Sequence, residues 1–516
     1  MGISAFNLIS QPWLPCVMVD GGATELGLAD ALIRAHDVRE LFDESPLVTL
    51  ALHRLLLAIL HRNFGPANTS EWFELWRRGR WNEEKLGEYF TRWHGRFDLF
   101  HPKHPFYQVT ELAGVGRQPI SVLFQELATG NNTTLFDHSY EDAPPALAPA
   151  TAARGLVARQ AFSVGFGKSQ PFYFSDSPLI RGFSVLIQGD NLFETLALNL
   201  HFMHGDSPIP HSSRREDIPA WERERPPLPR KEGTVPAGYL DYLSWQSRRI
   251  HLFAEGDPPI VRQCQLQQGL KLAEAPIDPF KAYRKDPNGG PVAVSFREEQ
   301  ALWRDSHALF EEAEQRPAIF NWLARLARDP RAESAGIKPS YRFAALGLAT
   351  DRGKAASVTL WRHERLPLPL KYLEDHDLLG DLGLALAYAE DLARELRAAA
   401  WTFATVLLKP SEETGQPPRR EEIEPIARSL APERRFWPAL ESIFLEFMTK
   451  LPEPDAAGRE AELLQWRSEV RGTAKTALKE TVRDLSASTR ELKAVAVAER
   501  AFRRNLRRRL EAEESL

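Results

Sequence analysis

The sequence predicts an α+β protein in which a large mixed α/β domain, residues 1–370, precedes a C-terminal four-helix bundle, residues 371–516. Two observations predict this division. Up to residue 370, short alternating apolar segments typical of strands lie between helical segments. Beyond it, Ala, Leu, Glu and Arg dominate and strand signals vanish. A chain of 516 residues is long enough for several domains, each with its own core.

The amino-acid composition limits the functions that the protein can have. The apolar and charged fractions, 43% and 26%, are those of an ordinary soluble protein. The 65 basic and 70 acidic side chains give a net charge of −5, so any nucleic acid must be bound through local patches. The two cysteines, Cys16 and Cys264, exclude a disulfide framework and a thiolate zinc site.

The chain opens without a recognisable export signal. Its longest early apolar run, residues 55–60, is flanked by charged side chains and is too short to cross a membrane. We therefore expect a cytoplasmic protein with no membrane segment and no cofactor.

The first elements follow from local signals. Residues 6–22 predict a short strand and a hairpin, with glycines at the turn. Residues 28–35 predict a helix. A firmer helix spans residues 45–60, because Ser45 caps it and Pro46 occupies its first turn. Its apolar positions surround it, so it should be buried. Residues 71–96 predict two short amphipathic helices rich in tryptophan.

Three closely spaced histidines raise the possibility of a metal site. They are His94, His101 and His104. Pro102 and Pro105 interrupt the segment, so a helical pair of ligands four residues apart is not available. Ordinary surface or core histidines are the favoured interpretation.

An irregular stretch, residues 162–178, is the strongest candidate for a binding surface. It follows a predicted helix, residues 151–161, and is too polar and too broken to be a buried element, yet too aromatic to be an idle loop. Gly165 and Gly167 let the backbone approach another molecule, and Lys168 adds a mobile positive charge. This combination suits nucleic acid. The alternative is that the glycines only shape a turn and the aromatic residues fill a core.

A nucleotide-phosphate loop is a rival interpretation of the same stretch, because Gly167-Lys168-Ser169 has the right ending. The pattern also requires glycine at position 162, which is Phe162, and a helix that opens at the lysine, which Pro171 prevents. The ATPase interpretation is rejected.

The rest of the first domain alternates strands, helices and exposed connections. Residues 261–272 predict strands that carry Arg262 and Lys271, either as basic contacts or as ordinary strand surface. Near the end of the domain, a glycine turn bears Arg352, Gly353 and Lys354 before a further strand. The remaining predictions are a strand at 179–189, a helix at 192–203, an exposed connection at 207–236 and renewed structure at 239–253.

Four amphipathic helical runs separated by proline- and glycine-containing loops predict the bundle. They span residues 378–408, 434–450, 459–485 and 488–511. The last run is strongly basic, with Arg503, Arg504, Arg507 and Arg508 among its cations. Either these residues form a solvated face near the negative end of the helix dipole, or they form a surface that follows a phosphate backbone.

At this point several stretches resemble one family, CasA, the large subunit of the type I-E CRISPR surveillance complex Cascade. They are the opening Phe6-Asn7-Leu8-Ile9 with Trp13 and Pro15, and residues 104–108, 239–249 and 361–370. Their order and spacing match over essentially the whole chain. The resemblance implies the mixed α/β domain, the helical bundle and no catalytic activity.

The resemblance also implies a function. Members inspect double-stranded DNA for the protospacer-adjacent motif, largely from the minor groove, and help to open the duplex beside it. Pairing to the guide RNA then reads the rest of the target, a division of labour known from other RNA-guided systems. The implied partners are other Cascade subunits, the guide RNA, target duplex DNA and the helicase–nuclease.

Three family elements would read the motif. A glycine loop falls on residues 164–168, with Gly165 as the best match. A lysine finger falls near Lys271, with Gly269 or Arg262 as alternatives. A wedge falls on residues 351–355, where this chain has Arg352, Gly353 and Lys354 in place of the family's glutamine. The wedge would act through this cationic tip or through bulk alone.

The family's loop toward the guide-RNA end resembles residues 131–137. Asn131 and Asn132 begin it, and Leu135 or Phe136 takes the aromatic position. The cysteine-rich metal knuckle of some members is absent here.

Two other function classes remain open. One is an architectural subunit whose basic C-terminal helix only holds RNA or a neighbouring protein. The other is a metal-dependent phosphohydrolase that uses His94, His101, His104 and nearby acids.

Overall fold

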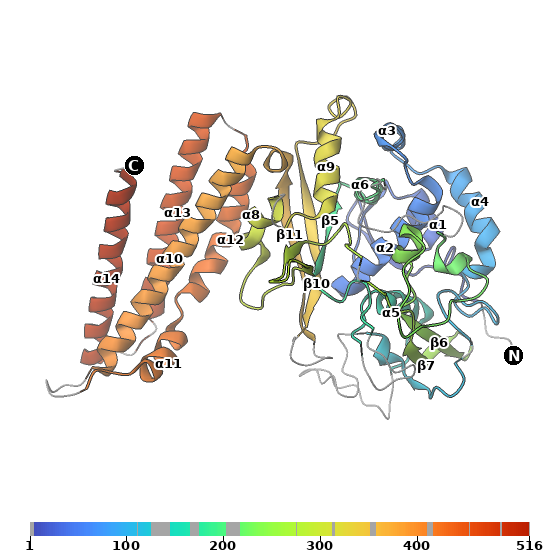
Figure 1. Cartoon of the computed structure of the whole chain (residues 1–516), viewed down its shortest axis with the longest axis horizontal. Coiled ribbons are helices and arrows are strands. Elements are labelled where there is room, and N and C mark those ends of the chain that lie inside the picture. Colours follow the sequence, from blue (N-terminus) through green and yellow to red (C-terminus); the bar gives the residue numbers. More distant parts are fainter. Residues whose placement is uncertain are drawn as a thin grey trace. The chain divides into compact units, whose positions relative to one another are not determined.

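In the computed structural model, the chain forms two compact units (Figure 1). The first comprises residues 1–302 and 308–366, and the second residues 303–307 and 367–516. The strands belong to the first unit, apart from the end of the last strand, and the second is helical, which confirms the α+β class. The described residues are 5–110, 112–124, 145–165, 175–202, 217–274, 276–311, 315–350, 358–409, 416–453, 455–483, 485 and 488–514.

The first unit opens with an antiparallel sheet in the order β2-β1-β3. β1 (Leu14–Met18) and β2 (Ala23–Leu26) form the predicted hairpin, whose turn contains Gly21 at φ +92°. Glycine adopts this left-handed conformation without the steric cost that a side chain would add. α1 (Leu28–Ile33) then leads into β3 (Val38–Leu41).

α2 (Pro46–Phe64) is the core helix of the first unit. Ser45 Oγ accepts the N–H of Val48 at 3.4 Å, which confirms the predicted cap. Every side chain from Leu47 to Leu60 is buried. Three elements pack against the helix: α5 (Pro149–Ala161), α7 (Tyr239–Leu243) and β10 (Ser340–Thr350). Among the described helices, it alone is long and apolar enough to span a membrane, so the sequence argument from length was wrong. Because 78% of the apolar part of α2 is buried inside the protein, α2 is a core helix.

His53 on α2 makes the stability of this unit depend on pH. Burial lowers its pKa to about 4, although a hydrogen bond between Nδ1 and Thr49 O (2.8 Å) opposes the shift. Between pH 6.5 and 4 the unfolded chain therefore binds more protons than the folded chain, and stability falls as pH falls through this window. At pH 5 the expected loss from His53 is on the order of 2 kcal/mol.

Denaturant unfolding at pH 7 and pH 5 measures this effect, and His53→Gln should remove part of the difference. An identical pH dependence in the variant would show that His53 does not carry it.

Two amphipathic helices follow, as predicted. α3 (Thr69–Arg78) and α4 (Glu83–Trp93) are capped by Asn68 and Asn82, and a 3-10 turn, His94–Arg96, ends the second. Trp72 stacks on Trp76 with ring centroids 5.2 Å apart. Its indole N–H donates to Ala197 O (2.8 Å), which ties α3 to α6 (Leu192–Leu198).

The second sheet has the order β11-β10-β5. β5 (Phe183–Gln188) pairs antiparallel with β10 (Ser340–Thr350), and β11 (Val358–Pro369) lies on the other side of β10. α9 (Ala318–Arg328) precedes β10. The predicted wedge, residues 351–355, thus falls between the ends of two long neighbouring strands.

The third sheet has the order β4-β7-β6, from β4 (Gln118–Pro119), β7 (Ile260–Gln268) and β6 (Arg248–Glu255). α5 (Pro149–Ala161) packs against β6 and β7, and α7 (Tyr239–Leu243) leads into β6 (Figure 1). A two-stranded ribbon, β8 (Tyr283–Lys285) with β9 (Pro291–Ala293), follows. Short 3-10 turns lie at Ile120–Leu123 and Ala220–Glu222.

Within its described residues, the second unit contains the four predicted long helices and an additional short one. The long helices are α10 (His376–Leu408), α12 (Glu433–Lys450), α13 (Ala456–Arg483) and α14 (Thr489–Glu514). The short helix, α11 (Arg420–Leu430), contradicts the prediction of a loop and packs against α10. α10 also packs against α13 and α14, and α12 against α13. A 3-10 turn at Leu370–Leu373 leads into α10. Another 3-10 turn, Leu302–Asp305, and α8 (Ser306–Phe310) lie earlier in the chain, before α9.

Candidate nucleic-acid interface

The two described ends of the glycine-rich stretch meet in the interior of the first unit. Residues 163–165 follow α5, and residues 175–178 return toward β5; we call these two segments the loop root. Ser163, Val164, Gly165, Ser175 and Ser177 are all buried. The prediction that this stretch is not a buried element is therefore wrong at both described ends. The residues between them, 166–174, lie outside the described part of the chain.

Arg248, the first residue of β6, joins the two ends of the loop root. Its side chain is fully buried. Nη2 donates to Val164 O and to Ser175 O, each at 3.0 Å. Nη1 donates to Ser247 O at 2.7 Å. A guanidinium carries several donors in a fixed plane, so one side chain can hold carbonyl groups from three separate segments.

Asp176 binds the N–H side of the peptide group whose carbonyl oxygen Arg248 binds. Its Oδ1 accepts the N–H of Gly165 at 2.9 Å, and its Oδ2 accepts Nε of Arg181 at 2.7 Å. The carbonyl of Val164 and the N–H of Gly165 belong to one peptide group. Arg248 and Asp176 therefore fix both polar ends of the peptide group that leads into the loop.

A chain of serine and glutamine hydrogen bonds closes the loop root. Ser177 N donates to Ser163 O (2.9 Å), and Ser177 Oγ lies 2.6 Å from Ser247 Oγ. Ser247 Oγ donates to Gln160 O (2.7 Å), so the proton between the two hydroxyls comes from Ser177. The Gln160 amide pairs with both backbone polar groups of Arg248, at 2.9 Å each. The polar side chains of this stretch are thus hydrogen-bonded in the interior.

Lys281 supports the segment that follows the loop root. It is buried, and its Nζ donates to Pro178 O and Arg181 O at 2.7 Å each. Burial disfavours the charged ammonium and lowers the pKa of Lys281 to about 8. Two buried cations, Arg248 and Lys281, therefore bind backbone carbonyls at the start and the end of this region.

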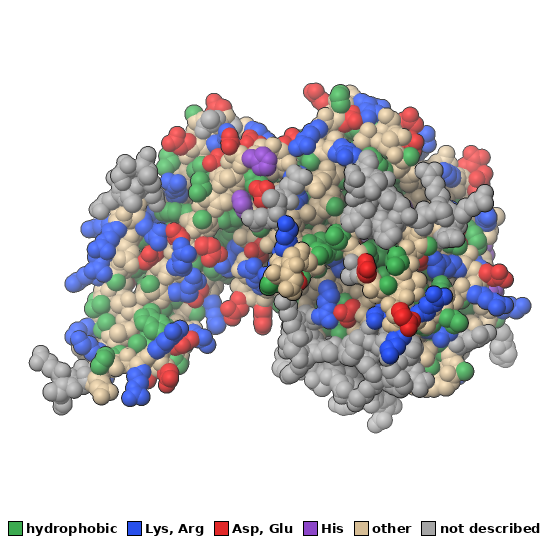
Figure 2. Space-filling view, in the orientation of Figure 1, with side chains coloured by type: hydrophobic (Ala, Val, Ile, Leu, Met, Phe, Trp, Pro, Cys, Tyr) green, Lys and Arg blue, Asp and Glu red, His purple; other side chains and the backbone are tan. Residues whose placement is uncertain are grey.

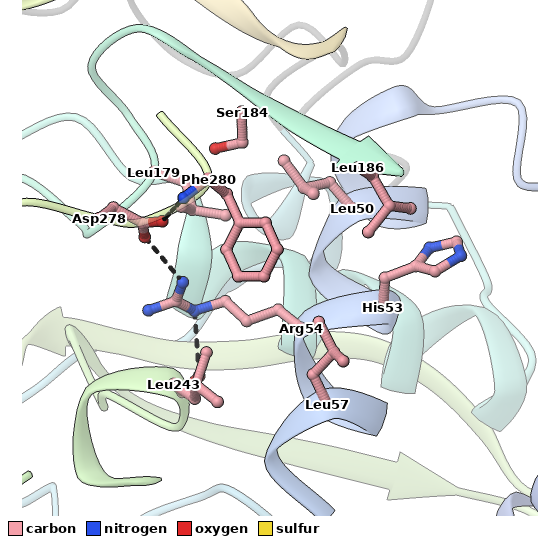
Figure 3. A pocket seen from close by; sticks show the side chains of 10 residues that line it. All are labelled: Leu50, His53, Arg54, Leu57, Leu179, Ser184, Leu186, Leu243, Asp278 and Phe280. Carbon is pink, nitrogen blue, oxygen red and sulfur yellow. Dashed lines mark hydrogen bonds and ion pairs between the residues drawn. The ribbon is translucent and has the colours of Figure 1, made fainter. Parts of the chain in front are cut away.

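A buried ion pair lies next to this support (Figure 3). Arg54 of α2 pairs with Asp278 at 3.1 Å, and it donates Nη2 to Tyr242 O at 2.8 Å. Asp278 also accepts the Tyr242 hydroxyl (3.0 Å) and the N–H of Phe280 (2.9 Å). The adjoining cavity of about 20 Å³ has room for one water molecule, so it is a packing defect beside the pair and too small for a substrate.

Asp278→Asn should lower the free energy of unfolding by about 3–5 kcal/mol, because it leaves the Arg54 charge buried without its counter-ion. Urea denaturation of the chain measures the loss. Asp37→Asn is the matched control, since Asp37 pairs with Arg34 while both are half exposed, and it should cost less than about 1 kcal/mol. Equal losses in the two variants would contradict a structural role for the buried pair.

Hydrogen bonds connect Leu270, the residue before Lys271, to the loop root. Leu270 N donates to Gln246 O (2.9 Å), and Ser175 Oγ donates to Leu270 O (3.4 Å). The structure thus brings together the segments that carry Gly165 and Lys271. Lys271 is half-buried, and its Nζ donates to Lys231 O at 3.2 Å.

Of the two alternatives to Lys271, Gly269 has a structural role and Arg262 is open to solvent. A Cβ added to Gly269 would come within 2.4 Å of Gln246 O, so glycine is required there by packing. Arg262 is exposed on β7. Lys271 and Arg262 therefore remain the two candidate donors of this region.

Other predicted site residues lie outside the described part of the chain. Gly167 and Lys168 belong to the segment between the two ends of the loop root. Asn131, Asn132, Leu135 and Phe136 belong to the connection before α5. Arg352, Gly353 and Lys354 belong to the connection between β10 and β11.

The cations of α14 divide into two groups. Arg509 binds Asp391 (2.7 Å) and Glu395 (3.1 Å) of α10, and Arg490 donates to Lys409 O, so these two hold the bundle together. Arg503, Arg504, Arg507 and Arg508 are exposed. Arg503 also pairs with Glu499 on its own helix at 2.9 Å. Lys and Arg side chains gather along the part of the surface where Figure 1 places α14 (Figure 2).

Of the three closely spaced histidines, His101 and His104 belong to one local turn, and His94 begins the 3-10 turn that follows α4. His101 Nδ1 accepts the N–H of Lys103 (3.2 Å) and of His104 (3.0 Å), and the His101 and His104 rings stack 5.9 Å apart. Within the described residues, no group of three or more His, Cys, Asp or Glu side chains is arranged to hold a metal ion. This part of the chain gives no support to the phosphohydrolase hypothesis.

Sequence reasoning missed Arg248, Asp176 and Lys281 as parts of the candidate site. One signal was present for Arg248. In β6 the inward positions are Arg248, Ile250 and Leu252, so an arginine occupies a position where the alternation predicts an apolar side chain. Such a buried arginine requires specific acceptors, and here they belong to the loop root.

The comparisons with known proteins agree with one another. The model of the family described as CRISPR-associated protein Cse1 matches residues 7–477. CRISPR-associated protein CasA/Cse1 of Thermus thermophilus is 34% identical over 517 residues, covering 98% of each chain. The crystal structure of CasA from Thermus thermophilus has a TM-score of 0.79 at 32% identity, covering 97% of this chain and 99% of that chain.

A chain of a solved CRISPR RNA-guided surveillance complex has the same fold. It matches with a TM-score of 0.72 at 22% identity, covering 96% of this chain and 99% of that chain. The family model and the relative at 34% identity each span nearly the whole chain. The chain therefore belongs to the Cse1 family of CRISPR-associated proteins, whose members are also named CasA.

Proposed function

We propose that this chain is the large, non-catalytic subunit of a cytoplasmic type I-E CRISPR surveillance complex. Its partners are the other Cascade subunits and the guide RNA. Membership of the Cse1 family and the fold shared with a chain of an RNA-guided surveillance complex support this proposal.

Within the complex, the chain recognises the protospacer-adjacent motif in duplex DNA and helps to open the duplex for guide RNA. The observation that carries this step is the loop root. A loop with glycines and a lysine suits contact with a duplex only if its ends are held, and here the buried Arg248 and the partly exposed Asp176 hold both ends. Gly165 fixes the start of the loop, Gly167 and Lys168 supply the close backbone approach and a donor, and Lys271 supplies a second donor.

Three further surfaces complete the proposal. Arg352, Gly353 and Lys354 form the wedge between β10 and β11. Asn131, Asn132, Leu135 and Phe136 contact the guide-RNA end. The second unit, with α14, helps to recruit the helicase–nuclease that degrades the target.

A purely architectural role is the second candidate, favoured by the exposed arginines of α14. In that case the basic helix holds RNA or a neighbouring subunit, and the glycine loop does not read DNA.

Duplex binding by the guide-loaded complex distinguishes the two, measured with and without this chain across a library of flanking motifs. Salt must be fixed because phosphate contacts make affinity fall steeply with ionic strength. The proposal expects motif-dependent binding only when the chain is present. Equal motif dependence without the chain would leave the architectural role.

A further inference from the structure

We propose that Arg248 and Asp176 are positioning residues that set the orientation in which the glycine loop leaves the protein core. The inference rests on the proposed function of the loop and adds two residues to it. Neither residue is expected to touch DNA, since Arg248 is fully buried and Asp176 is occupied by Gly165 and Arg181.

The argument begins with the Val164–Gly165 peptide group. Arg248 Nη2 binds its carbonyl oxygen at 3.0 Å, and Asp176 Oδ1 accepts its N–H at 2.9 Å. A glycine adds little steric restriction to its own backbone, so the chain at Gly165 has wide conformational freedom unless other groups remove it. Charged side chains on both sides of this one peptide group remove that freedom.

Arg248 also couples the two ends of the loop. The same Nη2 binds Ser175 O at 3.0 Å, and Asp176 is the next residue. The distance between the start and the end of the loop is therefore set by one guanidinium. Hydrogen bonds to charged groups are stronger than those between neutral groups, which makes this a stiff connection.

The neighbouring residue offers a matched control. Arg249 points to the opposite face of β6, is half-buried, and donates to Gln267 Oε1 at 3.2 Å on the adjacent strand. Arg248→Lys keeps a buried cation but lacks the planar set of donors that reaches three carbonyl groups. Arg249→Lys makes the same chemical change outside the loop root.

Hydrogen exchange of the isolated chain tests the positioning role without DNA. In Arg248→Lys, the Gly165 amide should exchange about tenfold faster or more, because the Val164–Gly165 peptide group loses the charged hydrogen bond at its carbonyl oxygen and opens more often. Amides of β7 should not change, and Arg249→Lys should match the wild type. Unchanged protection of Gly165 in Arg248→Lys would overturn the proposal.

Asp176 provides a second pair of variants that does not depend on a buried cation. Its side chain is about one-third exposed, so substitutions there should fold. Asp176→Asn retains an oxygen that accepts the Gly165 N–H, whereas Asp176→Ala does not. Faster exchange at Gly165 in Asp176→Ala, restored in Asp176→Asn, is the expected result; equal exchange in the two would contradict it.

The functional readout is motif discrimination by the guide-loaded complex. Arg248→Lys and Asp176→Ala should reduce the affinity ratio between preferred and scrambled motifs by about tenfold, while binding to the scrambled motif stays the same. Loss of affinity for both duplexes alike would assign these residues to folding alone. If wild-type complexes show no motif dependence, the proposed function fails, but the exchange experiment still decides whether Arg248 and Asp176 position the loop.

Discussion

Replacing Gly165 by aspartate is expected to abolish motif-dependent binding of duplex DNA by the assembled complex. Gly165 is buried and its N–H already donates to Asp176 Oδ1 at 2.9 Å. A second carboxylate at this position meets the first at short range, in a place with little access to water. The resulting displacement of the loop start should lower the affinity for the preferred motif by about a hundredfold or more.

Gly116→Asp is the matched control, because a Cβ at Gly116 meets no other atom within 4 Å. Both variant chains should enter the guide-loaded complex, as checked by size-exclusion chromatography, and only Gly165→Asp should lose binding. Wild-type affinity in Gly165→Asp would remove this residue from the site.

Neutralising the exposed arginines of α14 is the second change with a large expected effect. Replacing Arg503, Arg504, Arg507 and Arg508 by glutamine should weaken DNA binding about equally for all motifs, because phosphate contacts carry no base information. The slope of log affinity against log salt concentration should fall by about 1 for each arginine that contacts a phosphate. Fluorescence anisotropy at several salt concentrations measures both quantities.

The control variant removes the same number of exposed cations elsewhere in the second unit. Arg420, Arg428, Arg434 and Arg435 are exposed on α11 and α12. If the α14 variant instead fails to join the complex while the control joins normally, the helix holds a neighbouring subunit or RNA. An unchanged salt slope in an assembled complex would assign the α14 arginines to a solvated helix face.

Local signals predicted most of the fold. The cap and proline at Ser45-Pro46 located α2, and its apolar surroundings predicted its burial. The change of composition after residue 370 predicted the helical region. α11 was missed because the prolines and glycine before it favour a loop; a further proline, Pro425, is accommodated within the helix.

The candidate site was predicted less completely from the sequence than the fold was. The glycines at 165 and 167 indicated a loop, but the burial of its ends depends on partners far away in the chain. Arg248 lies 84 residues from Val164, and Lys281 lies 103 residues from Pro178. Local composition could not show that these buried cations satisfy the loop's polar groups, so the stretch was predicted to be unburied.

Direct contact between the glycine loop and the motif is the central claim, and site-specific photo-crosslinking tests it most directly. Lys168→benzoylphenylalanine would be incorporated into the chain, assembled with guide RNA and irradiated with a duplex that carries the preferred motif. Val19→benzoylphenylalanine, at a position 48% exposed in the first unit, provides the control. We predict crosslinks from position 168 that map to the motif base pairs and are lost with a scrambled motif. Crosslinks that are absent, or equally frequent at position 19, would contradict motif reading by this loop.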